Sequence, residues 1–172
     1  MTDEDIVTGI LKREAGYVNR AEDRGGPTNY GITMPTLEEW RRHKVTVDDI
    51  KNLTEAEARE IYLAMFIRRP GFSRIPDARL RELVVDAGVM SHPRHAAEWL
   101  QKVLGVRQDG VLGPQTMAKL AQTPSIFVYL GMCGLRMRIY GRLITSRPSQ
   151  AVFAAGWMNR VADFVENAPT HP

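Results

Sequence analysis

The stretch REAGYVNRAEDRGGPTNYGIT, residues 13–33, decides how the sequence divides into structural elements. It holds four glycines, two asparagines and two tyrosines, whereas the segments on either side have the apolar periodicity of helices. Turn-forming residues fill its second half: Gly25, Gly26, Pro27 and Asn29. Residues 30–33 follow with types that are common in short strands. We therefore expect a small β-hairpin after the first helix.

Helix signals recur through the remaining sequence, and strand signals are nearly absent. Thr2, Thr36 and Thr54 each precede an acidic residue by three positions, which is the pattern of a capped helix N-terminus. Together with the apolar spacing, these signals predict seven or eight helices in a mainly α single domain. The expected helices cover residues 3–14, 37–43, 55–67, 77–90, 93–104, 114–122 and 125–146, with a last one from Pro148 to about residue 167.

The composition of the 172 residues, 44% hydrophobic and 25% charged, is typical of a soluble globular protein. A net charge of +3 and a pI of about 9.2 favour anionic partners without choosing among them. Acidic residues follow Met1, so we expect no secretory signal peptide. The most apolar later stretch, residues 126–135, covers half of the roughly 20 residues that a membrane span needs. We expect it to form a core-facing helix.

Glu14 places a carboxyl group on the apolar face of the first expected helix. It follows Leu11, Ile10 and Val7 by three, four and seven residues, and residues at this spacing share a helix face. Burial and the negative end of a helix dipole both disfavour a charged carboxylate. A glutamic acid that keeps its proton can act as a general acid. Glu14 is therefore a candidate catalytic residue, although a glutamate before a glycine turn is also a common helix ending.

Asp23 supplies a second carboxyl group nine residues later, in polar surroundings that should keep it ionised. Glycoside hydrolysis uses two such groups: one protonates the leaving oxygen, and the other activates or orients water. Thr28 offers a hydroxyl that could position this water. Asn29 and Tyr30 are the predicted sugar contacts, because the nearby glycines admit a sugar and tyrosine offers a flat face. Turn capping and core packing are the structural alternatives for these four residues.

The pattern E-A-G-Y-V-N-x-x-x-D-x-G-G-P-T-N-Y-G-I-T resembles the signature of glycoside hydrolase family 108, which contains lysozyme-like muramidases of phage and bacterial origin. The resemblance implies a lysozyme-like fold, with Glu14 as the catalytic acid of an enzyme that cuts peptidoglycan glycan strands. The interval from Glu14 to Asp23 also resembles that of phage-type lysozymes. Thr28 departs from that pattern, because it follows Asp23 by five positions instead of six, and Ala15 stands where the family more often has glycine.

The second half of the chain resembles the peptidoglycan-binding-like region of the same family. LQKVLGVRQDGVLGPQT, residues 100–116, and GWMNRV, residues 156–161, carry this resemblance. We expect residues 1–90 to form the catalytic half and residues 91–172 a helical half that packs with it as one globular unit. The second half either binds wall polymer independently or completes one wall of the substrate cleft, and the second alternative is favoured.

The resemblance implies an N-acetylmuramidase that hydrolyses the β-1,4 bond between N-acetylmuramic acid and N-acetylglucosamine, as a phage endolysin that lyses bacterial cells. Its partners would be peptidoglycan strands and a separate holin-type protein for export, with no nucleic acid, and the protein would be a monomer. It would stay in the host cytoplasm until its release to the periplasm and cell wall. A lytic transglycosylase and a catalytically silent peptidoglycan-binding protein are the alternatives. Acid–base chemistry needs no cofactor.

Other chemistry-bearing residues favour structural explanations. His92 and His95 lie three residues apart and could ligate zinc, but Pro93 interrupts the pair and no metal site is expected. Cys133 is expected to be a small core residue. Four arginines follow the apolar stretch and would either form a solvated face, pair with acids of neighbouring helices, or meet an anionic surface: Arg136, Arg138, Arg142 and Arg147.

Overall fold

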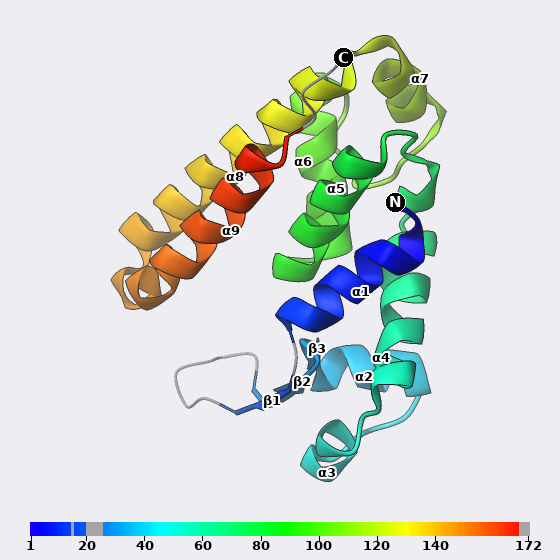
Figure 1. The fold of residues 1–172 in the computed structure, drawn as a ribbon, viewed down its shortest axis with the longest axis vertical. Helices are drawn as coiled ribbons and strands as arrows, with labels where there is room; N and C mark the ends of the chain where they lie inside the picture. The colour runs from blue at the N-terminus through cyan, green and yellow to red at the C-terminus, as the bar shows by residue number, and fades with distance from the viewer. Residues whose placement is uncertain (15, 20–25, 169–172) are drawn as a thin grey trace. The chain divides into compact units, whose positions relative to one another are not determined.

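The computed structural model describes residues 1–14, 16–19 and 26–168 (Figure 1). The chain divides into two compact units, Met1–Arg69 and Pro70–Pro172, which we call unit 1 and unit 2. Unit 1 holds the first helix, the sheet and the next three helices, and unit 2 is entirely helical in its described part. A mainly α fold with a small sheet after the first helix is therefore confirmed.

Helix α1, Asp3–Arg13, begins as its sequence predicts. The Thr2 N–H donates to the Asp5 carboxylate at 2.7 Å, and the Asp5 N–H donates to the Thr2 hydroxyl at 3.2 Å, which completes the capping box. Four apolar side chains of the helix are buried in the core: Ile6, Val7, Ile10 and Leu11. This face fixes the direction in which the end of α1 presents Glu14.

Three short antiparallel strands follow α1: β1 (Tyr17–Val18), β2 (Thr28–Asn29) and β3 (Ile32–Thr33), in the order β1-β2-β3. Strands β2 and β3 form the predicted hairpin, and β1 adds a third strand beside β2. Tyr30 and Gly31 form the two-residue hairpin loop with φ values of 50° and 73°. Two positive φ values are what a type I′ turn requires, and this turn matches the twist of the strands.

Three helices complete unit 1: α2 (Met34–Arg41), α3 (Val47–Lys51) and α4 (Glu55–Ile61), which continues as a π-helix over Tyr62–Arg68. The prediction that Thr36 begins a helix is wrong. Thr33 is the N-cap, because Pro35 suits the first turn and the Thr36 N–H donates to the Thr33 hydroxyl. The short helix α3, capped by Thr46, was not predicted from the sequence.

Unit 2 is built around the long helix α8. Its helices are α5 (Ala78–Met90), α6 (Pro93–Leu104), α7 (Pro114–Gln122), α8 (Ser125–Ser146) and α9 (Ala154–Glu166), with 3₁₀ turns at Phe72–Arg74 and Pro148–Phe153. Helix α8 packs against α5, α6 and α9, and α9 runs beside it (Figure 1). In the described residues, no helix has both the length and the apolarity for a membrane span.

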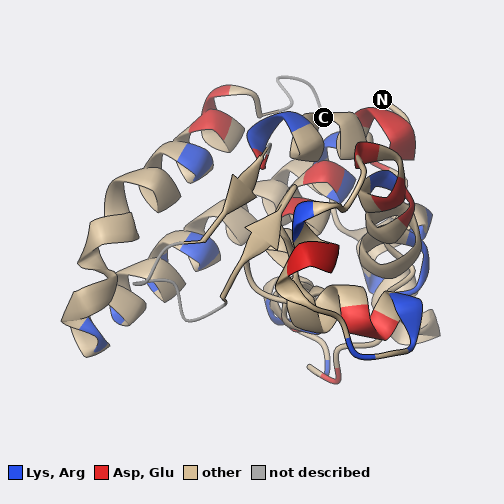
Figure 2. Cartoon of the chain, turned by 90° about the horizontal axis from the view of Figure 1, so that it is seen from below, with Lys and Arg blue, Asp and Glu red and all other residues tan. Residues whose placement is uncertain are grey.

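One arginine of α8 lies in a buried ion pair. No Asp or Glu occurs between Asp109 and Asp163, so α7 and α8 carry basic charges alone. Figure 2 marks the Lys and Arg residues of the chain in blue and the Asp and Glu residues in red. The Arg136 side chain is fully buried and contacts the equally buried Asp86 carboxylate of α5 at 2.8 Å. Arg160 of α9 contacts the other oxygen of Asp86, also at 2.8 Å. Among the alternatives for the arginines, Arg136 is thus a partner of an acid on a neighbouring helix.

Candidate active site

Glu14 ends helix α1 and lies against the turn of the β-hairpin. It is the C-cap residue, with φ −100° and ψ 14°, and its N–H donates to the Ile10 carbonyl at 2.9 Å. Its side chain is half-buried. A Cβ added at Gly31 would lie only 3.0 and 3.1 Å from Cβ and Cγ of Glu14. Glycine at position 31 therefore allows both the turn and its close approach to Glu14.

Tyr62 supports this turn, although nothing in the sequence pattern indicates that role. Its ring is fully buried, and its hydroxyl donates to the Tyr30 carbonyl at 2.8 Å. The same hydroxyl would lie 2.7 Å from a Cβ at Gly31. In the sequence, Tyr62 fits the apolar spacing of a helix. The sequence indicates only that its hydroxyl, if buried, needs a hydrogen-bond partner, and not which one.

Thr28 lies in the middle strand of the sheet. It is half-buried and pairs with Val18 on one side and Thr33 on the other. Directly paired residues point to the same face, so these three side chains share one face of the sheet. Asp23, the predicted second carboxyl group, lies outside the described residues.

Asn29, a predicted sugar contact, is held by the protein itself. Its side chain is 6% exposed, and its amide nitrogen lies 3.0, 3.2 and 3.4 Å from the carbonyl oxygens of Ile50, Lys51 and Leu53. These carbonyls belong to the C-terminal end of α3 and the residues after it, so Asn29 ties the sheet to that helix. A sugar contact by Asn29 stays a prediction, and this amide geometry does not support it.

Tyr30 and Tyr17 are the tyrosines of the opening stretch. Tyr30 is half-buried, and its N–H donates to the Gly16 carbonyl at 3.3 Å. Tyr17 is 38% exposed, and the Lys51 ammonium lies 5.9 Å from the centre of its ring. Both residues are thus partly exposed, and the predicted sugar contact by Tyr30 stays a prediction.

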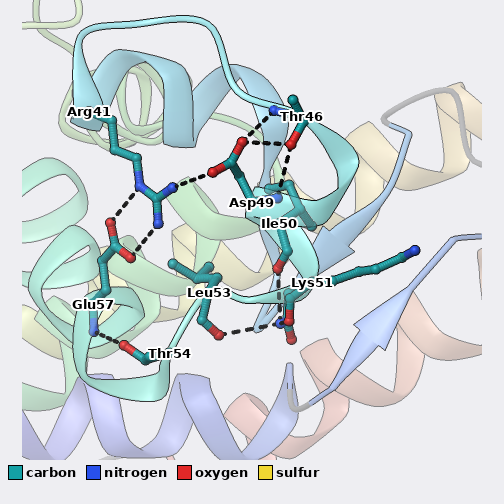
Figure 3. Close-up of polar contacts among 9 residues, drawn as sticks. Arg41, Thr46, Asp49, Ile50, Lys51, Leu53, Thr54 and Glu57 are labelled. Atoms are coloured by element: carbon teal, nitrogen blue, oxygen red, sulfur yellow. Dashed lines mark hydrogen bonds and ion pairs between the residues drawn. The ribbon is translucent and has the colours of Figure 1, made fainter.

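An ion-pair network joins α2, α3 and α4 (Figure 3). The Arg41 guanidinium donates to both oxygens of Glu57, at 2.9 and 2.8 Å, and to Asp49 at 3.0 Å. The hydrogen bonds from Arg41 hold the pKa of the Glu57 carboxyl below its usual value. The pKa of Asp49 is also lowered, mainly by the Thr46 hydroxyl that it accepts from. These contacts join α2, α3 and α4, and α3 is the helix whose C-terminal end holds Asn29.

The histidines make local contacts. His92 is the N-cap of α6, and its Nδ1 accepts from the Arg94 N–H at 3.2 Å. The His95 ring lies 6.0 Å from that of His92. Within residues 1–14, 16–19 and 26–168, no group of three or more His, Cys, Asp or Glu side chains is arranged to hold a metal ion. Burial raises the pKa of the Cys133 thiol to about 11, as for a core residue.

Comparisons with known proteins agree with these observations. The family model described as glycosyl hydrolase 108 matches residues 7–91, which include Glu14 and the whole sheet. A second model, described as a predicted peptidoglycan domain, matches residues 95–162. The solved structure of SagA from Brucella abortus is 30% identical, with a TM-score of 0.87, over 96% of this chain and 92% of that one. No curated protein matches the chain in sequence.

Proposed function

The chain belongs to the glycosyl hydrolase 108 family, and we propose that it hydrolyses the β-1,4 bond between N-acetylmuramic acid and N-acetylglucosamine. The family and the second matched region make it a lysozyme-like protein that acts on peptidoglycan. The observation that carries the finer proposal is the placement of Glu14. Glu14 is half-buried and ends α1 against the Gly31 turn, inside the matched segment.

In the proposed reaction Glu14 is the general acid. It donates its proton to the glycosidic oxygen as the bond to the sugar carbon breaks, so the leaving sugar departs as a neutral alcohol. Asp23 orients or deprotonates the water that attacks the sugar carbon, and Thr28 helps to hold that water. Tyr30 and Asn29 remain the proposed sugar contacts. The role of Asn29 would have to come from its oxygen, since its nitrogen already faces three carbonyls.

The biological role that we propose is lysis of bacterial cells as an endolysin. The protein would be a monomer that reaches the periplasm and cell wall from the host cytoplasm with a separate holin-type protein. The matched peptidoglycan domain and the basic balance of unit 2, with twelve Lys or Arg against seven Asp or Glu, support contact with an acidic wall polymer.

The test is digestion of isolated peptidoglycan with the unmodified protein, Glu14→Gln and Asp23→Asn, with the new sugar ends identified by mass spectrometry. We expect reducing N-acetylmuramic acid ends from the unmodified protein and strong losses in both variants. Anhydro ends would identify a lytic transglycosylase instead. If the unmodified protein binds peptidoglycan but the glycan stays intact, the protein is a catalytically silent wall-binding protein.

A further inference from the structure

Unit 1 also contains a pocket with a lining different from the described residues of the proposed active site. It has a volume of about 530 Å³ and lies between the C-terminal end of α2 and the π-helix. None of the site residues predicted from the sequence is among its described lining residues. The lining residues are Glu39, Trp40, Arg42, Ala64, Met65 and Arg69.

Arg42, which lines this pocket, holds an unusual backbone conformation. It is the C-cap of α2, with φ 60° and ψ 28°, and its N–H donates to the Glu38 carbonyl at 2.8 Å. This left-handed position is the one that glycine normally occupies at a helix end. The chain therefore keeps an exposed arginine side chain at the pocket where the backbone alone would favour glycine.

Arg69 brings a second guanidinium to the same pocket. The π-helix places it there, because the Arg69 N–H donates to the Ala64 carbonyl five residues earlier, at 2.9 Å. Arg69 pairs with Glu39, yet its side chain stays 68% exposed. Two arginines and one glutamate leave the pocket with an excess positive charge. Single π-turns inside helices are frequent at functional sites.

Trp40 gives the pocket an aromatic wall and is half-buried. Its neighbour in the chain, Arg41, donates two hydrogen bonds to the Glu57 carboxylate. Arg41 is held in turn by Asp49 (Figure 3). Trp40 thus directly precedes the arginine that joins three helices, and Ala64 and Met65 add apolar surface to the pocket.

We propose that this pocket binds the peptide stem of peptidoglycan through its carboxylates, which rests on the proposed function of the chain. Guanidinium groups recognise carboxylates with paired, charge-assisted hydrogen bonds. In peptidoglycan the carboxylates lie on the stem, because the lactyl group of the sugar is joined to it as an amide. The apolar wall suits the methyl groups of alanine, and the volume suits a short peptide.

The test measures binding by titration calorimetry, with Glu14→Gln as the parent so that no bond is cut. The probes are a disaccharide that carries a tetrapeptide with alanine and diaminopimelate, the same disaccharide with its lactyl carboxyl group capped as a methylamide in place of the peptide, and the free tetrapeptide. We expect both peptide-bearing probes to bind, and the disaccharide tetrapeptide to bind about tenfold more tightly than the capped disaccharide. Equal affinities for the two disaccharides would overturn the proposal.

Arg42→Gly separates binding from folding. Since glycine favours the left-handed conformation, this change should leave the unfolding midpoint equal or higher, while the affinity for the tetrapeptide falls about tenfold. Arg68→Gln is the matched control, because it removes one exposed positive charge that does not line the pocket, and it should keep the affinity within about twofold. Equal losses in both variants would show that general charge, not the pocket, binds the peptide.

Glu39→Gln gives a change in the opposite direction. It removes the partner of Arg69 and should tighten tetrapeptide binding, whereas a weakened affinity would contradict the assignment. Cleavage of isolated peptidoglycan by the unmodified protein is measured in parallel. If the unmodified protein cleaves peptidoglycan but Arg42→Gly leaves the tetrapeptide affinity unchanged, only the pocket proposal is contradicted. If the tetrapeptide binds but no peptidoglycan is cleaved, only the proposed hydrolase activity is contradicted.

Discussion

Replacing Gly31 by alanine tests the contact between the hairpin turn and Glu14. An L-residue at φ +73° costs about 1–2 kcal/mol in backbone energy. The new Cβ would also lie 2.7 Å from the Tyr62 hydroxyl and 3.0 Å from Cβ of Glu14, so a neighbour must move. Losing the hydrogen bond from Tyr62 to Tyr30 adds about 1 kcal/mol. We expect a total destabilisation of about 2–3 kcal/mol.

Gly26→Ala is the matched control for the backbone contribution. Gly26 has nearly the same φ, +72°, but no atom of the described residues lies within 4 Å of the position that a Cβ would take there. Gly26 precedes Pro27, and a proline restricts the backbone of the residue before it. This restriction can only raise the cost of Gly26→Ala, so it makes the expected difference between the two variants smaller. Urea unfolding followed by circular dichroism should show Gly31→Ala to be the more destabilising by about 1 kcal/mol.

Tyr62→Phe tests whether the Tyr62 hydroxyl causes the extra destabilisation of Gly31→Ala. Removing the hydroxyl removes the nearest contact of the new Cβ, so Gly31→Ala should cost less in this background than in the unmodified protein. The reasoning is refuted if Gly31→Ala costs no more than Gly26→Ala, or if its cost is the same with and without the hydroxyl.

Three further changes test the packing around the site and in unit 2. Arg41→Gln should cost about 1 kcal/mol at pH 7. The pKa of Glu57 is lowered from 4.5 in the folded protein, so the stability that its ion pair with Arg41 contributes is present above about pH 4.5 and is lost as the pH falls. The urea midpoints of variant and parent should therefore converge towards about pH 3. Asn29→Asp places a carboxylate against three carbonyls and should lower the free energy of unfolding by about 2 kcal/mol or more, whereas a neutral result would contradict the observed amide contacts. Asp86→Ala leaves Arg136 buried without its partner and should cost about 3–5 kcal/mol, and adding Arg136→Met should recover much of this loss in thermal unfolding.

The sequence predicted the elements whose signals are local. The capping box at Thr2 and the hairpin residues act within a few positions, and the structure confirms both. The start of α2 was misplaced because Thr33 and Thr36 are both good N-caps. Only the chain geometry after the hairpin selects Thr33.

The contacts that position the site join residues far apart in the sequence. Tyr62 reaches the Tyr30 carbonyl across 32 positions, and Asn29 reaches the end of α3 across more than 20. No pattern in the sequence links them. The short helix α3 was missed for a related reason, since five residues are too few for a recognisable apolar period. The candidate carboxyl of Glu14 was found because its own helix determines where it lies.

The central claim is that Glu14 is the general acid of a muramidase, and the most direct test is the rate of release of reducing ends from isolated peptidoglycan. The rate is compared for the unmodified protein, Glu14→Gln and the exposed-site control Glu60→Gln, each with its unfolding midpoint. General acid catalysis contributes about 10²–10⁴-fold, so Glu14→Gln should lose at least about 100-fold while it stays folded and the control stays active. A folded Glu14→Gln variant that releases reducing ends within about tenfold of the unmodified rate would contradict the account.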